Sequence, residues 1–161
     1  MKEQILDLLE KDARLTAKEI AVLIGEGEET VRASIKELEK DQIICGYSTL
    51  INWDDFDKDL VTALIEVKVT PQRDQGFDKI ARRIYKFSEV KAVYLMSGGF
   101  DLTVIVEGRS IKDIALFVSS KLSPLESVLS TATHFVLKKY KDHGVVLEKQ
   151  EKSDERMLVA P

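Results

Sequence analysis

Two histidines, one cysteine and two adjacent aspartates are the side chains of this sequence best suited to catalysis. His134 lies in an apolar, β-rich run and His143 in the turn-like segment KDHGV. Neither has a second His or Cys two to four residues away, the spacing typical of metal sites. Cys45 stands alone, and Asp54 and Asp55 fall in an acidic stretch where solvated carboxylates are expected. We therefore assign no catalytic residue, no metal site and no cofactor.

The composition is typical of a globular protein of one ordinary domain or two small ones. The chain has 161 residues, 44% hydrophobic and 32% charged. No apolar run approaches the roughly 18 residues needed to cross a bilayer. The N-terminal MKEQILDLLEKD mixes charges with aliphatic residues, unlike a secretory signal. Because a single cysteine supports no disulfide framework, we expect a cytoplasmic protein.

The negative charge is concentrated near the N-terminus. The net charge is −4, and residues 1–52 carry seven Lys/Arg against eleven Asp/Glu, so the remainder is neutral. The bulk basic charge expected of a nucleic-acid-binding protein is therefore missing. Any contact with DNA must come from a few locally placed cations.

Residues 1–52 predict three short helices and a strand. The apolar stripes at helical spacing are Ile5, Leu8 and Leu9; Ile20, Leu23 and Ile24; and Val31, Ile35 and Leu38. Thr16 and Glu19 predict a capping box, and Gly25 and Gly27 bracket a tight turn. The run QIICGYSTLI predicts a short strand or hairpin. This is a winged helix-turn-helix layout, with a three-helix bundle for protein contact as the alternative.

Beyond an acidic segment, NWDDFDKDL, the apolar period changes to two. Strands are predicted from VTALIEVKVT, EVKAVYLMS, FDLTVIVEG and VLSTATHFVLKKY. Helices are predicted from two stripes: Phe77, Ile80, Ala81, Ile84 and Phe87, with Lys79, Arg82, Arg83 and Lys86 on the solvent side, and Ile111, Ile114, Ala115, Val118 and Leu122. The order βαββαβ is the ferredoxin-like pattern. The sheet face away from the helices still carries apolar residues, which predicts a homodimer pairing sheet against sheet.

The N-terminal residues resemble the DNA-binding domain of the Lrp/AsnC family of prokaryotic transcriptional regulators. The matching positions are Asp12-Ala13-Arg14 before Thr16, then Val31, Ile35, Leu38 and Glu39, and the exit Ile44-Cys45-Gly46-Tyr47. The resemblance spans the whole segment and implies sequence-specific binding to double-stranded DNA.

The sequence departs from the family pattern where DNA would be touched. Ser34 replaces a frequent arginine, Gln42 replaces a common glycine, and the turn ends in Glu26-Gly27-Glu28-Glu29 instead of a small polar cap. The two glutamates suit the positive end of a helix dipole but repel a phosphate. The candidates that remain for DNA contact are Lys18, Thr30, Arg32, Ser34 and Lys36.

The run VYLMSGGFDLTVIVEG resembles the hairpin of the family's effector domain. The family motif there implies a small-molecule site, often for an amino acid, where dimers meet. The matching candidates are Ser97, Gly98, Gly99, Phe100 and Asp101, with Thr131 and Thr133 as weaker ones. The glycines would let backbone N–H groups approach a carboxylate, and Asp101 could accept from an ammonium group. Alternatively, the glycines serve the hairpin and Asp101 caps its turn.

We therefore expect an α+β protein: an N-terminal winged helix-turn-helix (1–52), a linker (53–60), a ferredoxin-like βαββαβ effector domain (61–147) and a polar tail (148–161) with a possible docking strand. The expected function is a non-enzymatic DNA-binding transcriptional regulator modulated by a small molecule. We expect a homodimer assembling into higher oligomers such as octamers. Two alternatives remain: a siroheme decarboxylase subunit with the same two-domain plan, and a sensing module with little DNA binding.

Overall fold

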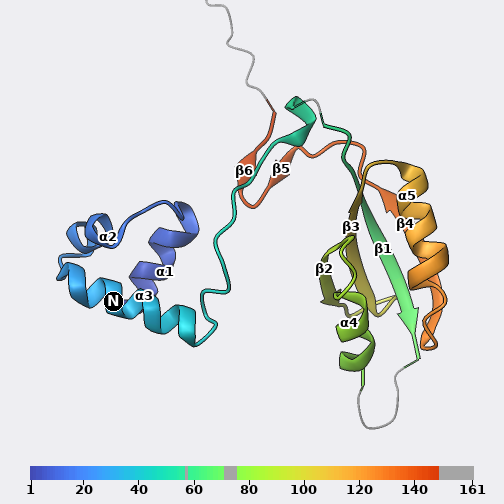
Figure 1. The fold of residues 1–161 in the computed structure, drawn as a ribbon, viewed down its shortest axis with the longest axis horizontal. Helices are drawn as coiled ribbons and strands as arrows, with labels where there is room; N and C mark the ends of the chain where they lie inside the picture. Colours follow the sequence, from blue (N-terminus) through green and yellow to red (C-terminus); the bar gives the residue numbers. More distant parts are fainter. Residues whose placement is uncertain (57, 71–75, 149–161) are drawn as a thin grey trace, which may run out of the picture. The chain divides into compact units, whose positions relative to one another are not determined.

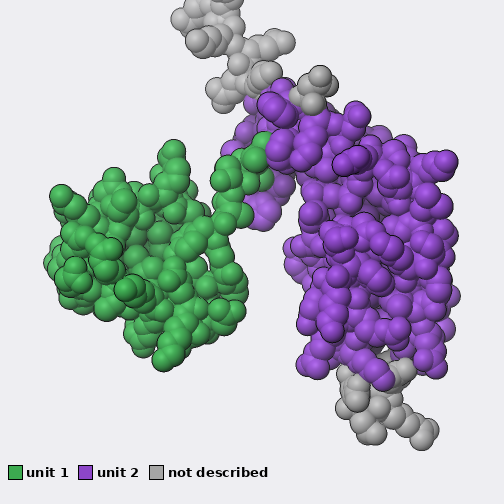
Figure 2. All heavy atoms as spheres, in the orientation of Figure 1, with its two compact units in different colours: residues 1–51 green, residues 52–161 purple. Residues whose placement is uncertain are grey.

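The computed structural model describes residues 1–56, 58–70 and 76–148. The chain divides into two compact units, Met1–Ile51 and Asn52–Pro161 (Figure 2). We refer to them as the N-terminal unit and the effector unit. Within the described ranges, every helix falls short of the length and apolarity that crossing a membrane requires.

The N-terminal unit consists of three helices around a small apolar core. These are α1 (Lys2–Lys11), α2 (Ala17–Ile24) and α3 (Glu28–Lys40). The fully or nearly fully buried side chains are Ile5, Leu9, Ile20, Ala21, Val31 and Leu38. The stripes predicted for α1 and α3 are confirmed, since Leu8 and Ile35 pack against this cluster from partly exposed positions.

The stripe predicted for α2 needs one correction. Leu23 is 61% exposed, whereas Ala21 is 5% exposed and belongs to the core. At 100° per residue, Ala21 and Leu23 lie about 80° to either side of the direction midway between Ile20 and Ile24, so periodicity alone does not choose between them. The small alanine takes the inner position where α2 packs on α3.

The strand or hairpin expected from QIICGYSTLI is not formed in this structure. Residues 41–44 form turns, and residues 45–52 have no strand assignment. A strand requires a neighbour for its backbone groups, but the N–H groups of Ile43 and Ile44 donate to the Leu38 carbonyl at 2.9 and 3.1 Å. The Tyr47 hydroxyl donates to Glu39 at 2.9 Å. The segment is therefore tied back to α3.

The effector unit contains the predicted βαββαβ order. Its elements are β1 (Val61–Val69), α4 (Asp78–Ile84), β2 (Val90–Leu95), β3 (Leu102–Gly108), α5 (Ile111–Phe117), the π-helical turn η2 (Val118–Leu122) and β4 (Val128–Phe135). The sheet order is β2-β3-β1-β4, and each neighbouring pair is antiparallel (Figure 1). The α+β fold class is confirmed.

Both helices of the effector unit pack on one face of the sheet. The inward side chains of β1 are Ala63, Ile65, Val67 and Val69, and those of β3 are Leu102, Val104 and Val106. From the helical layer come Ile80, Ile84, Ile114, Phe117 and Leu122. The period-two prediction for β1 is confirmed. The stripe predicted for the second helix is partly wrong, because Ile111 is 58% exposed while Phe117 is buried.

Two short elements complete the effector unit. A 3-10 turn, η1 (Trp53–Asp55), lies in the segment expected as a linker. The strands β5 (Lys141–Asp142) and β6 (Val145–Val146) form a two-residue hairpin. Its turn residues His143 and Gly144 have φ of 43° and 80°, as a primed hairpin turn requires. The docking strand expected in the tail lies outside the described residues.

Candidate functional site

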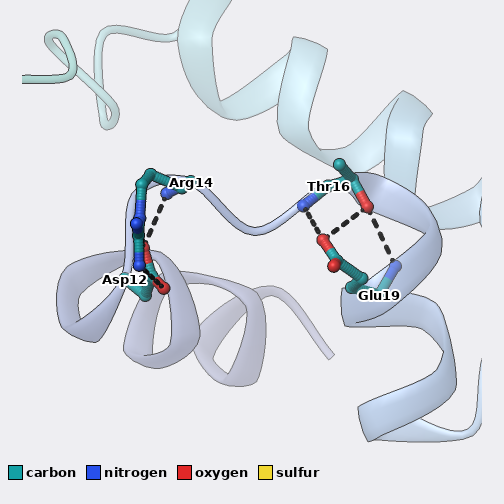
Figure 3. A network of polar contacts seen from close by, with 4 residues as sticks. All are labelled: Asp12, Arg14, Thr16 and Glu19. Carbon is teal, nitrogen blue, oxygen red and sulfur yellow. Dashed lines mark hydrogen bonds and ion pairs between the residues drawn. The ribbon is translucent and has the colours of Figure 1, made fainter.

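A capping box fixes the start of α2. The Thr16 hydroxyl accepts from the Glu19 backbone N–H at 3.3 Å, and Glu19 accepts in return from the Thr16 N–H at 2.8 Å (Figure 3). The Thr16 hydroxyl also donates to the same carboxylate at 2.7 Å. The bond from the Thr16 backbone N–H lowers the pKa of Glu19 most, and the bond from the Thr16 hydroxyl lowers it further. The predicted capping box is confirmed, and it sets the direction in which α2 leaves the turn.

The turn before α2 is held by a bidentate ion pair. Arg14 donates to the two carboxylate oxygens of Asp12 from Nε and Nη2, at 3.0 and 3.1 Å, and its backbone N–H adds a third bond at 3.0 Å (Figure 3). These bonds lower the pKa of Asp12. Arg14 is therefore engaged within its own turn even though its side chain is 90% exposed.

A glycine makes the tight turn between α2 and α3. Gly25 has φ 73° and ψ 31°, a left-handed conformation that favours glycine, and its N–H donates to the Ala21 carbonyl. The Glu26 N–H donates to the same carbonyl at 3.0 Å. The helix α3 then begins at Glu28, so the predicted helix-turn-helix is present.

The exposed surface of α2 and α3 holds four of the five candidate DNA contacts. Lys18, Thr30, Arg32 and Lys36 are exposed. Ser34 lies apart from them: it is 5% exposed, and its hydroxyl donates to the Thr30 carbonyl at 2.9 Å. A buried hydroxyl that already has its partner offers nothing to a groove, so we omit Ser34 from the surface considered further.

Arg32 is paired within its own helix. Its guanidinium contacts the Glu28 carboxylate one turn earlier, and its Nε lies 3.7 Å from a Glu29 oxygen. Pairs three and four residues apart meet on one helix face. The cation best suited to bidentate phosphate contact therefore already has carboxylate partners. In the part of the chain that the structure describes, Lys18 and Lys36 form no ion pair within 4.0 Å.

The effector hairpin is closed at its base by a backbone bond. The Met96 N–H donates to the Asp101 carbonyl at 2.8 Å, which leaves Ser97 to Phe100 as the loop. Gly98 has φ 144°, a conformation that L side chains rarely adopt, so this position favours glycine. Gly99 carries no such requirement. Ser97, Gly98 and Gly99 are exposed and Phe100 is half-buried.

Asp101 joins this loop to the central strand. Its carboxylate accepts from the Val69 backbone N–H at 2.8 Å, and its own N–H donates to the Val67 carbonyl at 3.1 Å. Asp101 thus bonds to β1, 32 residues earlier, in addition to closing its own hairpin. Val69 was not predicted as part of the site, and no short-range pattern in the sequence pairs it with Asp101. Among the described residues, the second carboxylate oxygen of Asp101 accepts no hydrogen bond.

The strand β4 brings one of the weaker candidates near Asp101. Thr131 is paired with Val67, so Thr131 and Asp101 flank the same residue of β1, about 10 Å apart at two strand spacings. Thr133 is paired with Ile65, one step further along the strand. Both threonines are half-buried and face the helical layer, as their partners Val67 and Ile65 do. The hairpin loop and the threonines therefore flank one end of β1.

The residues best suited to catalysis are dispersed. His134 lies 3.3 Å from Glu66 on the sheet face opposite the helices, and His143 lies 2.8 Å from Asp142 in the β5–β6 turn. The Cys45 thiol is exposed and donates to the Gln42 carbonyl at 3.1 Å. Among the described residues no three His, Cys, Asp or Glu side chains gather as a metal site would require.

The combination of a capped helix-turn-helix and a ferredoxin-like unit defines a two-domain regulator, and comparison with known proteins identifies its family. A family model described as "AsnC-type helix-turn-helix domain" matches residues 3–39, and "Lrp/AsnC ligand binding domain" matches residues 62–146. The chain therefore belongs to the Lrp/AsnC family. It is a helix-turn-helix transcriptional regulator with a ligand-binding domain.

Curated relatives match along nearly the whole chain. The uncharacterized HTH-type transcriptional regulator YugG of Bacillus subtilis is 48% identical over 98% of this chain and 95% of its own length. The HTH-type transcriptional regulator LrpA of Pyrococcus abyssi is 31% identical over 85% of this chain and 94% of its own. Because these relatives are named as regulators, the prediction of a non-enzymatic protein is confirmed.

A solved structure supports the fold. The transcriptional regulator NMB0573 of Neisseria meningitidis, solved as an L-Met complex, superposes with a TM-score of 0.69 over 88% of this chain and 90% of that chain. Its sequence identity is 23%, so this likeness concerns the fold.

Proposed function

We propose that this regulator binds double-stranded DNA in the cytoplasm and that a small molecule, an amino acid or a related metabolite, changes its assembly and its DNA binding. The observation that carries the proposal is the pairing of a helix-turn-helix with a hairpin loop whose exposed glycines and Asp101 are held against β1. The L-Met complex of a regulator with the same fold supports the amino-acid class.

The DNA contacts that we propose are Lys18, Thr30, Arg32 and Lys36. Three cations, one of them paired with glutamates, predict weak binding by a single N-terminal unit. Appreciable affinity then requires several units bound at once, which an oligomer supplies through effective concentration. DNA binding and assembly are therefore coupled in this proposal, and an effector that changes assembly changes both.

The proposed assembly is a homodimer that forms higher oligomers such as octamers. The support is exposed apolar surface on the effector unit: Tyr94 on the sheet face away from the helices is 55% exposed, and Leu137 beyond β4 is 96% exposed. Val145 and Val146 in the short hairpin are also more than half exposed. Exposed apolar side chains on such elements support an interaction surface. Sedimentation at several protein concentrations tests the assembly, and a monomer at all of them would contradict it.

The proposed ligand contacts are the N–H groups around Gly98 and Gly99 for a carboxylate and Asp101 for an ammonium group, with Ser97, Phe100, Thr131 and Thr133 around them. Thermal shift with a panel of amino acids tests this site. Two substitutions separate the tasks of Asp101. Asp101→Asn keeps an oxygen that can accept from Val69 but removes the charge, whereas Asp101→Ala removes both.

We expect Asp101→Asn to keep the Tm of the free protein and lose the ligand-induced shift. Asp101→Ala should lower the Tm of the free protein as well. A normal ligand shift in Asp101→Asn would remove Asp101 from the site. Binding of the protein to its own upstream DNA, measured between about 50 and 200 mM salt, tests the DNA function. No binding at the lower salt and no amino-acid stabilisation would together refute the proposal.

Of the two alternatives, the sensing module with little DNA binding differs from the proposal only in the DNA measurement. The hypothesis of a siroheme decarboxylase subunit requires histidine and basic residues that are placed to hold a tetrapyrrole. His134, the histidine of the expected domain, sits beside Glu66 on the sheet face opposite Thr131 and Thr133. A purified protein with tetrapyrrole absorbance would favour that reading.

A further inference from the structure

Helix α4 of the effector unit presents a row of exposed cations. Lys79, Arg82 and Arg83 lie in the helix, and Lys86 follows in the turn that ends it. Residues spaced three, four and seven apart share one side of a helix. The opposite side of α4 is anchored in the core by Ile80 and Ile84, at 4% and 0% exposure. We call the four cations the α4 stripe.

The four cations of the α4 stripe form no ion pair with the described residues. Among the described residues, none of these four side chains lies within 4.0 Å of a carboxylate, whereas Lys121 in the same unit contacts Glu89 and Arg32 contacts Glu28. The single carboxylate of the helix, Asp78, lies in its first turn. Four like charges on one face repel one another and favour a polyanionic partner.

The shape around the α4 stripe suits a string of phosphates. A hollow of about 640 Å³, open to solvent, is lined by all four cations together with Gly76, Phe77 and Asp78. From Lys79 to Lys86 the stripe rises about 10 Å, at about 1.5 Å per residue. That length corresponds to about three phosphates of one DNA strand, at about 3.4 Å of axial rise each. The stripe could therefore neutralise two to four phosphates of a duplex.

We propose that the α4 stripe is a second, sequence-independent DNA contact, on the effector unit. This inference rests on the proposed DNA-binding function. It also addresses the weakness noted in the N-terminal unit, where Arg32 is paired and residues 1–52 are net acidic. The stripe supplies phosphate contacts that the helix-turn-helix lacks, and the helix-turn-helix supplies contacts with base edges.

The test compares three proteins of full length: the natural chain, a stripe variant (Lys79→Gln, Arg82→Gln, Arg83→Gln, Lys86→Gln) and a charge-matched control (Lys68→Gln, Arg109→Gln, Lys112→Gln, Lys141→Gln). The control removes four positive charges from exposed positions that also lack ion pairs within the described ranges but form no row on one helix. Binding to the upstream DNA is measured as a function of salt. Sedimentation and thermal unfolding of the same samples report assembly and folding.

In the stripe variant, the magnitude of the slope of log K against log salt concentration should decrease by about 2 to 4, because each lost phosphate contact removes about 0.9. The control should change it by less than about 1. A random-sequence duplex should show the same loss, because phosphates carry no sequence information. Equal slopes for the stripe variant and the control would overturn the inference and leave the proposed function standing.

Two further outcomes are also decisive. If the natural chain binds no DNA at low salt, the proposed function fails and this inference fails with it. If the stripe variant sediments with a different mass from the natural chain, the stripe is an assembly contact between copies, and the DNA assignment is wrong. An unchanged mass, an unchanged Tm and a reduced salt slope together support it.

Discussion

The two units of this protein satisfy their polar groups over different distances along the chain. In the N-terminal unit, Arg14 bonds to Asp12, Glu19 to Thr16 and Arg32 to Glu28, each within four residues. In the effector unit, Asp101 bonds to Val69 and Lys121 to Glu89, each across 32 residues. Apart from Lys2 and Glu37, which pair across 35 residues, the side-chain bonds of the first unit are local, whereas the second unit combines local bonds with bonds between elements distant in sequence.

This difference teaches how charge should be counted in a DNA-binding protein. Arg32 of α3 and the stripe on α4 look alike in composition, as cations on exposed helix faces. Glu28 contacts Arg32 one turn later in α3, whereas Asp78, at the same spacing before Arg82 in α4, forms no ion pair with it within 4.0 Å. The ion pairs that form, more than the net charge or the spacing of acids along a helix, decide which cations are available to a partner.

The largest expected effect separates the stabilities of the two units. Leu38→Ala and Ile84→Ala each remove a buried side chain and should each cost about 2 to 5 kcal/mol. Trp53, the single tryptophan, lies in the effector unit, so its fluorescence reports that unit, while far-UV circular dichroism reports the helices of both. We expect Leu38→Ala to leave the fluorescence transition in urea unchanged. Val22→Ala, at a 78% exposed position, is the control.

If Leu38→Ala shifts the fluorescence and circular dichroism transitions equally, the two units unfold together. The contrast between a locally stabilised unit and a separately stabilised one would then be wrong.

The next effect concerns the capping box. Thr16→Ala removes the oxygen that caps the first turn of α2 and should destabilise the N-terminal unit by about 1 kcal/mol. Thr16→Ser keeps that oxygen and should be close to neutral. Urea unfolding followed by circular dichroism measures both. Equal stability of the alanine and serine variants would mean that the local contact contributes little.

A stabilising change is expected directly after α3. Gln42 has φ 57°, in the left-handed region where glycine is favoured, so Gln42→Gly should raise stability by up to about 1 kcal/mol. Gln42→Ala, which retains a Cβ, should not raise it. The midpoint of thermal unfolding distinguishes the two. No gain with glycine would indicate that the Gln42 side-chain bond to the Glu39 carbonyl, at 3.2 Å, offsets the strain.

Releasing Arg32 should strengthen DNA binding modestly. In Glu28→Gln with Glu29→Gln, the guanidinium loses its carboxylate partners and becomes available to a phosphate. One added phosphate contact should increase the magnitude of the slope of log K against log salt concentration by about 0.9. When the salt concentration falls fourfold, the affinity of the double variant should therefore rise about threefold more than that of the natural chain. Glu37→Gln is the control, because it removes one negative charge from α3 without removing a partner of Arg32. Weaker binding in the double variant would show that the glutamates themselves serve recognition.

The smallest effect is a dependence of stability on pH. The pKa of Glu19 is lowered by its bonds from Thr16, so its contribution is present above the ordinary value of 4.5 and is lost as pH falls through the lowered pKa. Asp12 behaves in the same way beside Arg14. As the pH is lowered past about 4.5, the urea concentration at the unfolding midpoint of the N-terminal unit should therefore decrease. The Glu19→Gln variant should show a smaller decrease. An identical profile in that variant would exclude Glu19 as a source.

The sequence predicted those features that depend on neighbours along the chain. The capping box, the glycine turn, the order of strands and helices, and the inward positions of β1 all follow from spacings of two to four residues. The inner face of α2 was misjudged because eight residues define two overlapping stripes, and only packing on α3 selects Ala21 over Leu23. The expected strand after α3 requires a partner strand, which no local pattern supplies.

The candidate sites divide in the same way. Lys18, Thr30, Arg32 and Lys36 were placed on the surface correctly, because helical period fixes their direction. The burial of Ser34 was missed, since it lies just beside the stripe of Val31, Ile35 and Leu38 and a serine carries no apolar signal. The bond from Val69 to Asp101 could not be predicted, because the register between β1 and β3 is set by the fold.

A long-range hydrogen bond ties the start of the effector unit, beside η1, to the residues that follow the β5–β6 hairpin. The Asn52 side chain donates to the Leu147 carbonyl at 2.9 Å, across 95 residues, and Lys138 contacts Glu148 at 2.8 Å beside it. The first and last described residues of the effector unit therefore lie close together. Domains whose termini lie close together tolerate insertion into another chain and circular permutation. Residues 52–148 are therefore suited to production as a separate domain or to fusion with a different DNA-binding domain.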